Sequence, residues 1–506
     1  MRRDLRYLAN AHIRDSVVRF ARILLPLLIL SIAEAARAQY PGTASGSVTA
    51  SAATMSQDTS ASSNMNSLQN PFLGSVSSGT ATPQVLRLSL REAIERGLRY
   101  NLGLLVDEQS TREFRGQRWE ALSHLLPQVT TETREAKEMV NLKAIGFPSS
   151  IRNVNPISGP FNVFDTRAFL SSPILDFHAL RNERAASEQV RAAQYTYQDA
   201  RNLVVLVVGN AYLLSIAAES RVHEAEAEVN TAQALYELAV DRLHAGLSPE
   251  IDMLRAQVEL TFRKEQLIAA RNEDSTAKLN LTRVIGLPDG QGFALSTQMP
   301  FEPLEGITRE KALADAYGNR PDYKAAMAAV RAAQERRRAV EAERWPSLSF
   351  DGNYGDLGLT PSESHGTFLA QVSVKIPVFQ GRRVHGELIQ ADAQLKQKQA
   401  QLENLKGQIS YDVRTSLLNL ETAAQQVAAT HSNVGLAAKT LTQARDRYKA
   451  GVTDNIEVVQ AQGAVSSADQ SYISSLYQYN LAKVALARAV GIAEQAVLRY
   501  LGGKQP

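Results

Sequence analysis

The chain has 506 residues and a formal net charge of +3, with acidic and basic residues interspersed. This balance argues against a nucleic-acid-binding protein, in which lysine and arginine concentrate on one surface. Cysteine is absent, which excludes disulfides, thiol catalysis and cysteine-based metal sites. Aromatic residues make up only 6% of the chain. Alanine, leucine, glutamine and glutamate are plentiful, and that composition favours long helices.

The N-terminal segment, residues 1–38, has the layout of a secretory signal peptide. An arginine-rich start is followed by an apolar run from Ile23 to Ala33, and small residues then lead to a predicted cleavage site after Ala38. The apolar run is too short to span a bilayer as a helix. An uncleaved membrane anchor is the alternative to a signal peptide. No other segment approaches twenty apolar residues, so we expect an exported protein without a transmembrane helix.

Residues 39–85 are a low-complexity segment. They consist mostly of Ser, Thr, Ala, Gly, Asn and Gln and show no hydrophobic period. Such a segment cannot bury enough apolar surface to offset the entropy lost on ordering, so it is predicted to be disordered.

Residues 86–295 form the first of two similar segments. A helix is predicted from Ser89, an N-cap residue with Glu92 three positions further on, to about His124. Two strands of about ten residues follow, in which apolar and polar residues alternate. A loop rich in Gly, Pro, Asn and Ser, residues 144–160, separates the strands.

A very long helix is predicted after the second strand. From about residue 178 to 245 the helical pattern runs without a proline, which gives roughly 100 Å of helix. That length is typical of a coiled coil or a helical barrel. A turn at Gly246 and a return helix, which ends before Gly286, complete a helical hairpin.

The second segment, residues 305–496, repeats this order, and residues 497–506 are a C-terminal tail. Helices are followed by two alternating strands, a second long helix, a turn at Gly451 and a return helix. A period near 3.5 in the second long helix indicates helices that wind around one another. The apolar residues with this period are Leu388, Ala391, Leu395, Leu402, Leu405, Ile409, Val413, Leu417, Leu420, Ala424 and Val427.

The two hairpin turns share a sequence pattern. A basic residue, Arg242 or Arg447, stands four positions before the turn glycine, and an acidic residue, Asp252 or Glu457, stands six positions after it. Glycine supplies the positive φ that such a turn needs.

The strands of one chain cannot complete a barrel. Ten-residue strands with one apolar and one polar face suit a transmembrane β-barrel, but four strands are too few to close one. Unpaired strand edges in lipid cost several kcal/mol per backbone group. Several copies must therefore share one barrel, and their helices would form a second barrel that continues the first.

On these features the chain resembles the TolC family of outer-membrane efflux proteins. The resemblance covers residues 86–495 and rests on the duplicated strand–strand–long helical hairpin unit, on the Pro377 to Gly381 element and on both glycine turns. It implies a mainly α fold with a membrane β-barrel part: a homotrimer whose twelve-stranded β-barrel lies in outer-membrane lipid and continues as a periplasmic α-helical barrel. It also implies transport without chemistry, a periplasmic adaptor protein and an inner-membrane pump of the RND, MFS or ABC type.

The resemblance also implies roles for residues of the hairpin tips. Glu457 corresponds to an acid that lines the periplasmic gate, and the position of a second acid holds Gln460. Tyr448 and Asp252 match two partners of a closed-state link, whose arginine position holds Thr453. Acids near a helix N-terminus are also favoured by the helix dipole alone. The residues expected to contact the adaptor are Arg242, Gly246, Leu247, Ser248, Arg447, Gly451 and Val452.

Two other classes of protein compete with a channel. A periplasmic adaptor also carries a helical hairpin, but it would hold one hairpin within β-rich flanking domains. A secreted coiled-coil structural protein would not need strands between its helices. The sequence contains no His-Glu-x-x-His, Gly-x-Ser-x-Gly or phosphate-loop motif. We therefore predict no enzymatic activity, catalytic residue, metal site or cofactor, and no nucleic-acid partner.

Overall fold

The structure of the protein is a computed structural model. It describes residues 70–141, 144, 157–296, 299, 301–304, 306–453 and 455–501. The predicted signal peptide and residues 39–69 of the predicted low-complexity segment lie outside the described residues.

The described chain consists of two series of elements in the same order. The first series is η1 (Pro71–Leu73), β1 (Leu86–Leu88), α3 (Leu90–Tyr100), α4 (Leu102–Ser123), β2 (Gln128–Asn141), β3 (Ile157–Leu175), α5 (Phe177–His244), α6 (Glu250–Ile285) and β4 (Phe293–Leu295). The second series is α7 (Arg309–Asn319), α8 (Pro321–Ala342), β5 (Ser347–Gly358), β6 (Ser364–Lys375), α9 (Arg383–Lys449), α10 (Asn455–Val490) and α11 (Ala493–Tyr500). From α3 to α6 and from α7 to α10, each helix and strand has a counterpart in the other series.

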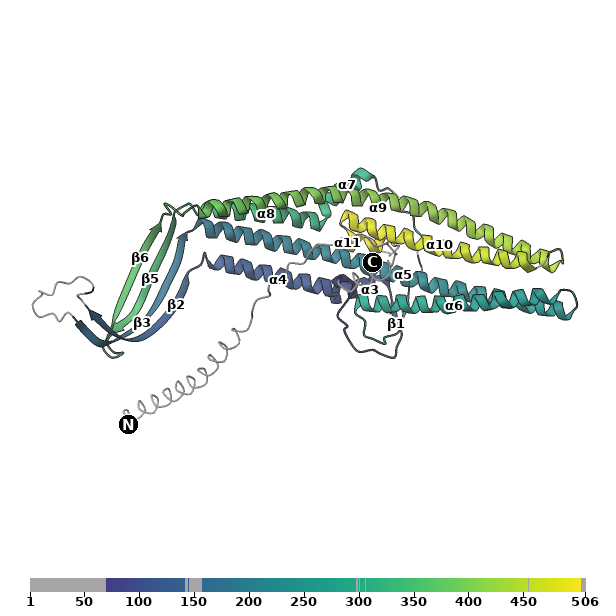
Figure 1. The fold of residues 1–506 in the computed structure, drawn as a ribbon, viewed down its shortest axis with the longest axis horizontal. Helices are drawn as coiled ribbons and strands as arrows, with labels where there is room; N and C mark the ends of the chain where they lie inside the picture. The colour runs from purple at the N-terminus through teal and green to yellow at the C-terminus, as the bar shows by residue number, and fades with distance from the viewer. Residues whose placement is uncertain are drawn as a thin grey trace, which may run out of the picture. The chain divides into compact units, whose positions relative to one another are not determined.

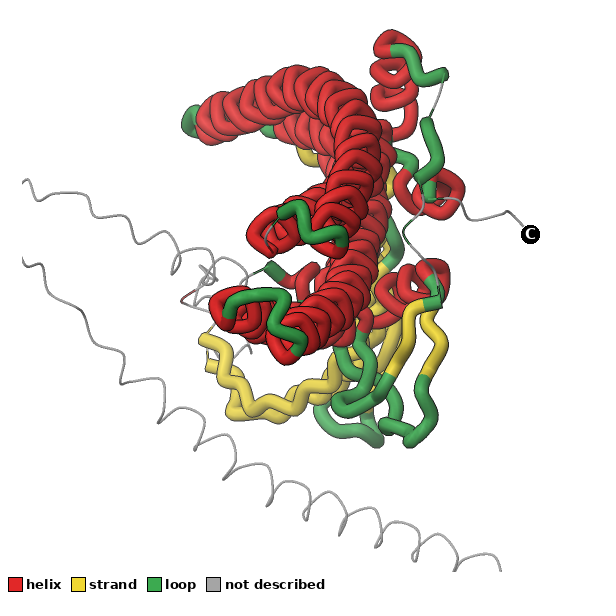
Figure 2. The backbone as a smooth tube through the Cα atoms, turned by 90° about the vertical axis from the view of Figure 1, so that its right-hand side faces the viewer, coloured by secondary structure: helices red, strands yellow, loops and turns green. Residues whose placement is uncertain are grey.

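The two hairpin helices match their predicted bounds closely. Helix α5 has 68 residues and α9 has 67, so each is roughly 100 Å long. Figure 1 shows the strands at one end of these helices and the two hairpin tips at the other. Figure 2, which looks at the tips, shows the long helices side by side in a curved row.

The N-terminal segment is ordered further than predicted. Residues 70–85 belong to the predicted disordered segment, but they form η1 and pack against later parts of the chain. The Val76 N–H donates to the Tyr100 carbonyl at 2.8 Å, and the Thr82 N–H donates to Gln291 Oε1 at 2.8 Å. These partners are distant in sequence, so no local sequence pattern predicts the contacts.

The predicted helix from Ser89 to His124 is in fact two helices. The Ser89–Glu92 capping box is present, but the helix breaks at Asn101. That side chain is buried, and its Oδ1 accepts hydrogen bonds from the backbone N–H groups of Gly103 and Leu104. Asparagine favours such a helix start because its short side chain replaces the missing backbone partner.

Two other predicted bounds are wrong. The strands of the first series have 14 and 19 residues rather than about ten, and β3 begins at Ile157, inside the predicted loop. Helix α11 crosses the predicted boundary at residue 496, so the predicted tail begins within a helix.

The four long strands form one antiparallel sheet in the order β2-β3-β5-β6. Its register brings apolar residues together in neighbouring rows of one face. One row of paired residues on the first face is Val129, Leu170, Gly352 and Ala370, and the next is Thr131, Ala168, Tyr354 and Phe368. The opposite face carries paired charges, Glu132 beside Arg167 and Arg134 beside Asp165. Strands β2 and β6 each pair on one side only.

The main apolar core lies around the middle of α5. Val204, Val205 and Val208 are fully buried there, against residues of α3, α6, α10 and α11. Among the described helices, α5 is the one with an 18-residue window that is apolar enough to cross a membrane, but 61% of that window is buried inside the fold. Core packing accounts for the apolar character of this window.

A buried ion-pair network holds the second series together at the break between α7 and α8. Arg320 is 5% exposed, and its Nη1 lies 2.9 Å from an Asp412 carboxylate oxygen on α9. Its Nη2 lies 2.6 Å from Asp322 on α8, and the Arg320 backbone packs against Gly491, where a Cβ would lie 2.7 Å from the Arg320 nitrogen. Arg320 thus joins α8 to α9 and to the end of α10.

We expect Arg320→Ala to lower the free energy of unfolding by about 3–5 kcal/mol, because it leaves two carboxylates without their buried partner. Denaturant unfolding of the detergent-solubilised protein, followed by circular dichroism, measures this change. Arg331→Ala is the matched control, since it removes an exposed ion pair with Glu188 and should cost less than about 1 kcal/mol. Equal losses in the two variants would contradict the structural role given to Arg320.

Candidate functional site

Both hairpin tips end their long helix with the same backbone hydrogen bonds. At the first tip the Gly246 N–H donates to the Leu243 carbonyl at 3.0 Å, and the Leu247 N–H donates to the Arg242 carbonyl at 2.8 Å. The second tip repeats both bonds around Gly451, at 3.0 Å each. The two glycines have φ values of 68° and 73°. This is the Schellman motif, which satisfies the last carbonyl groups of a helix through a glycine of positive φ.

Arg242 joins the first tip to the second. Its Nη1 donates to the Tyr448 carbonyl at 2.9 Å, and its guanidinium lies 4.7 Å from the centroid of the Tyr448 ring. The tyrosine is 2% exposed and belongs to an apolar cluster between the two hairpins. The other buried members of this cluster are Leu235, Ala239, Ala256, Ala444, Val458 and Ala461.

Asp252 lies buried beside this contact. Its backbone carbonyl accepts a hydrogen bond of 2.6 Å from Nδ2 of Asn455, a fully buried residue at the start of α10. Its carboxylate lies 3.6 Å from Arg255. Burial raises the pKa of Tyr448; the charge of Asp252 adds to this rise and that of Arg242 opposes it. Since these charges act on the tyrosine, Asp252, Tyr448 and Arg242 form one electrostatic group.

The Tyr448 hydroxyl group accepts and donates no hydrogen bond among the described residues of the tips. The direct tyrosine–aspartate link implied by the family resemblance is therefore not formed between Tyr448 and Asp252 here. The arginine that contacts the tyrosine comes from the first tip, at Arg242, and the position on the second tip is a half-buried Thr453.

Glu457 forms a separate pair at the second tip. Its Oε1 lies 3.5 Å from Nη1 of Arg447, and the two side chains are 41% and 56% exposed. Gln460, one helical turn further, is exposed. An exposed pair of this kind contributes about 0–1 kcal/mol to stability, so the Glu457 side chain can exchange Arg447 for other partners at little cost.

The ends of the tips present apolar side chains to solvent. Leu247 and Val452, at equivalent positions after the two turn glycines, are each 69% exposed. Both turn glycines and Arg447 are exposed as well, whereas Arg242 and Ser248 are half-buried. An apolar groove lies beside them between the starts of α6 and α10. Its apolar lining consists of Ile251, Leu254, Val258, Ile456 and Val459.

Two residues that the sequence did not predict as part of the site, Asn455 and Arg255, contact Asp252. Asn455 stands 205 residues after Glu250, the same offset that separates the two turn glycines. At this position of the repeat the first half has a carboxylate, Glu250, and the second half has an amide, Asn455. The change from carboxylate to amide does not indicate that Asn455 is buried between the hairpins.

A second functional surface is the apolar face of the sheet and the junction below it. Phe368, Val372 and Val374 on β6 and Tyr354 on β5 are exposed by more than half. Trp119, Trp345 and Phe379 lie exposed where the helices meet the strands. Aromatic side chains at the ends of an apolar band are typical of a membrane interface. No group of three or more His, Asp or Glu residues in the described part of the chain could hold a metal ion.

Comparison with known proteins agrees with this geometry. The family described as outer membrane efflux protein matches residues 94–287 and 312–492. The chain is 22% identical to the alkaline protease secretion protein AprF of Pseudomonas aeruginosa over 67% of this chain and 72% of AprF. It is 22% identical to the probable efflux pump outer membrane protein TtgC of Pseudomonas putida over 80% of this chain and 83% of TtgC.

Solved structures show the same fold. The crystal structure of the CmeC outer membrane channel of Campylobacter jejuni superposes with a TM-score of 0.69 at 16% identity, and the match covers 86% of this chain and 96% of CmeC. The mostly helical fold is therefore that of an outer-membrane channel.

These findings confirm the resemblance to the TolC family and exclude the adaptor and coiled-coil alternatives, because both halves of the chain match a channel family. The protein is an outer-membrane exit duct with a periplasmic helical extension, and the family and its relatives are channels rather than enzymes. The chain belongs to the outer membrane efflux protein family.

Proposed function

We propose that this chain is one third of a homotrimeric channel that carries substrates from an inner-membrane pump across the periplasm and the outer membrane. The single observation that supports this most is the sheet β2-β3-β5-β6, whose two outer strands each lack a partner on one side. In lipid, every backbone N–H and C=O group needs a hydrogen-bond partner. Three copies, with β6 of each beside β2 of the next, give a closed barrel of twelve strands.

The character of the two sheet faces supports this barrel. The face that carries Val129, Leu170, Tyr354 and Phe368 would contact lipid, and the face that carries Glu132, Arg134 and Arg167 would line the water-filled interior. The curved row of helices in Figure 2 continues the same closure below the membrane. Many apolar residues of α9 remain exposed in one chain, Ile389, Leu418 and Leu436 among them, and a neighbouring subunit would cover them.

We further propose that the two matched halves are the two repeats of the family, the first over residues 86–295 and the second from residue 305 to the end of α11, after a signal peptide of residues 1–38. The partners would be a periplasmic adaptor protein and an inner-membrane pump. AprF is named as a secretion protein and TtgC as an efflux pump component. The class of the pump, RND, MFS or ABC, would depend on whether this chain serves secretion or efflux. The exposed Leu247 and Val452, with the turn glycines and Arg447, form the surface proposed for the adaptor.

The tips would also form the gate. Glu457 lies near the start of α10 with a partly exposed carboxylate, and a ring of three such acids would set the charge at the constriction of the trimer. Arg242, Tyr448, Asp252 and Asn455 join the two hairpins within one chain. This contact would hold the tips in one relative position, as the closed-state link does in the family.

The trimer gives the first prediction. The purified protein in detergent should have three times the mass of one chain by light scattering. Val372→Lys, on the face proposed to meet lipid, should reduce the amount of trimer in the outer membrane, because a lysine there costs up to about 2–4 kcal/mol. Gln371→Lys, one residue earlier on the opposite face, should assemble normally. A stable monomer, or equal losses in the two variants, would contradict the barrel.

The contact between the hairpins gives the second prediction. Arg242→Ala should increase hydrogen exchange of the backbone amides of residues 447–453 about tenfold, because a cation–π contact and a hydrogen bond from a charged donor together contribute about 1–3 kcal/mol. Arg242→Lys keeps the charge, and its hydrogen exchange should be intermediate between that of the wild type and that of Arg242→Ala. Lys449→Ala removes a nearby exposed cation and should leave the exchange unchanged. Unaltered exchange in Arg242→Ala would show that the contact does not hold the tips.

The acid at the second tip gives the third prediction. Glu457→Lys should lower the cation selectivity of single channels in planar bilayers, because it changes the charge of a threefold ring by six units in the proposed trimer. Lys449→Glu, an opposite change at an exposed position of the same tip, is the control for charge outside the constriction. If Glu457→Lys channels keep wild-type selectivity, Glu457 does not line the gate.

A further inference from the structure

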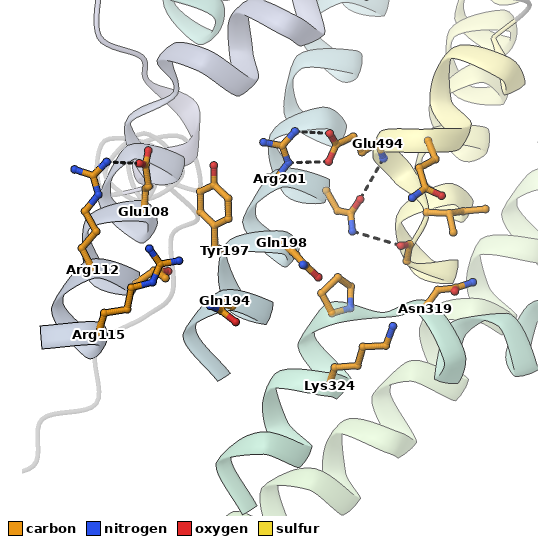
Figure 3. Close-up of a pocket in the computed structure, with 16 residues that line it drawn as sticks. Glu108, Arg112, Arg115, Gln194, Tyr197, Gln198, Arg201, Asn319, Lys324 and Glu494 are labelled. Atoms are coloured by element: carbon orange, nitrogen blue, oxygen red, sulfur yellow. Dashed lines mark hydrogen bonds and ion pairs between the residues drawn. The ribbon is translucent and has the colours of Figure 1, made fainter. Parts of the chain in front are cut away.

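A large polar pocket lies far from both the tips and the strands. It has a volume of about 800 Å³ and is formed by α4, α5, the end of α7, the start of α8, the residues that link α10 to α11, and α11. Figure 3 shows the side chains of α4 on one side of the pocket, those of α8 on the other and those of α5 between them. None of the functions proposed above uses this pocket.

The charges that line the pocket are unequal. Four basic side chains face it, from Arg112, Arg115, Arg201 and Lys324, but only two acidic ones, from Glu108 and Glu494. Both acids are already paired: Arg112 lies 2.8 Å from Glu108, and Arg201 holds Glu494 with two hydrogen bonds, of which the one from Nε measures 2.8 Å. The pocket therefore carries an excess of two positive charges.

Arg115 and Lys324 supply this excess. They come from α4 and α8, Arg115 is exposed and Lys324 is half-buried, and neither side chain has a hydrogen bond or ion pair to any residue in the described ranges. By contrast, Arg118, three residues after Arg115 and outside the pocket, pairs with Glu183 at 2.9 Å. Two unpaired cations on opposite walls make the pocket electropositive and favour an anionic ligand.

The rest of the lining is suited to a hydrophilic ligand. Gln194 and Gln198 of α5, Asn319 and Gln495 supply amide groups, and Tyr197 supplies a hydroxyl group, while Pro321 and Ile492 are the main apolar contributions. Amide and hydroxyl groups both donate and accept hydrogen bonds, as sugar hydroxyl groups require. The volume is also larger than a single inorganic ion would fill.

We propose that this pocket binds an anionic sugar that lies between α4 and α8, with its carboxylate or phosphate group on one of the two unpaired cations, Arg115 or Lys324, and its hydroxyl groups on the amide side chains of α5. Both anions have the same chemistry toward a guanidinium and an ammonium group. One chain builds the whole pocket, so the proposal does not depend on the gate or on the partner assignments.

Isothermal titration of the intact detergent-solubilised protein tests this proposal with four probes: glucuronate, glucose 6-phosphate, neutral glucose and inorganic phosphate. We expect a charged sugar to bind and glucose not to bind. Whether glucuronate or glucose 6-phosphate binds more tightly identifies the anionic group. Binding of inorganic phosphate as tight as that of both charged sugars would mean an adventitious ion only, and the absence of binding by any anionic probe at millimolar concentration would also overturn the proposal.

Matched variants show where the probe binds. Arg115→Gln combined with Lys324→Gln should weaken binding of the charged sugar by about tenfold or more, because each removes a charged hydrogen-bond donor. Lys396→Gln combined with Arg414→Gln removes two exposed cations of α9 and should leave the affinity unchanged. Lys324→Arg keeps the charge and should preserve binding, and an unchanged circular dichroism spectrum of the first double variant shows that its loss of binding is not a folding defect. Equal affinity in the two double variants would place the binding elsewhere and overturn the proposal.

Discussion

The backbone of the two outer strands imposes the constraint on which the rest of the fold depends. Strands β2 and β6 each leave one edge of hydrogen-bonding groups unpaired, and hydrocarbon offers these groups no partner. A single copy of the sheet is therefore incomplete in the outer membrane, however well its faces are patterned. The register places apolar residues on one face and charges on the other. This arrangement is favourable only when the edges are closed, because one face then contacts only lipid and the other only water.

The same requirement explains the helices. Each strand pair is followed by a long helix, at once in α5 and after a short link in α9, so the curvature of the proposed barrel would be passed on to these helices. A helix of roughly 100 Å with a narrow apolar stripe is not stable by itself, because most helical stability in proteins comes from tertiary packing. The described chain supplies part of that packing, between α5, α8, α9 and α10 near Arg320 and in the core around Val204. The exposed apolar residues of α9 need a neighbour, and the proposed barrel would bring one beside them.

The sequence predicted those parts of the fold that depend on local patterns. The turn at Gly246 follows from a glycine at the end of a long helical period, and the capping box follows from Ser89 and Glu92, which lie three residues apart. The parts that were missed depend on distant contacts. Residues 70–85 are ordered by partners such as Gln291, some two hundred positions away, and composition carries no sign of them. At the tips, the repeat drew attention to Asp252 and Glu457 because both equivalent positions hold an acid. The buried Asn455 is equivalent to Glu250, so the two repeats share no residue type there that would predict its contact.

The position of Arg242, the arginine that contacts Tyr448, changes how the proposed gate would work. The arginine that contacts Tyr448 comes from the first tip, so the link runs between the two hairpins of one chain. A cation–π contact and a charged hydrogen bond together contribute about 1–3 kcal/mol. Opening that moves α9 and α10 away from α5 and α6 must break this contact in every subunit, and in a trimer the sum is about 3–9 kcal/mol. An equilibrium of that size keeps the tips in one state until a partner binds the other state more tightly, and the exposed Leu247 and Val452 offer such a partner a surface beside the link.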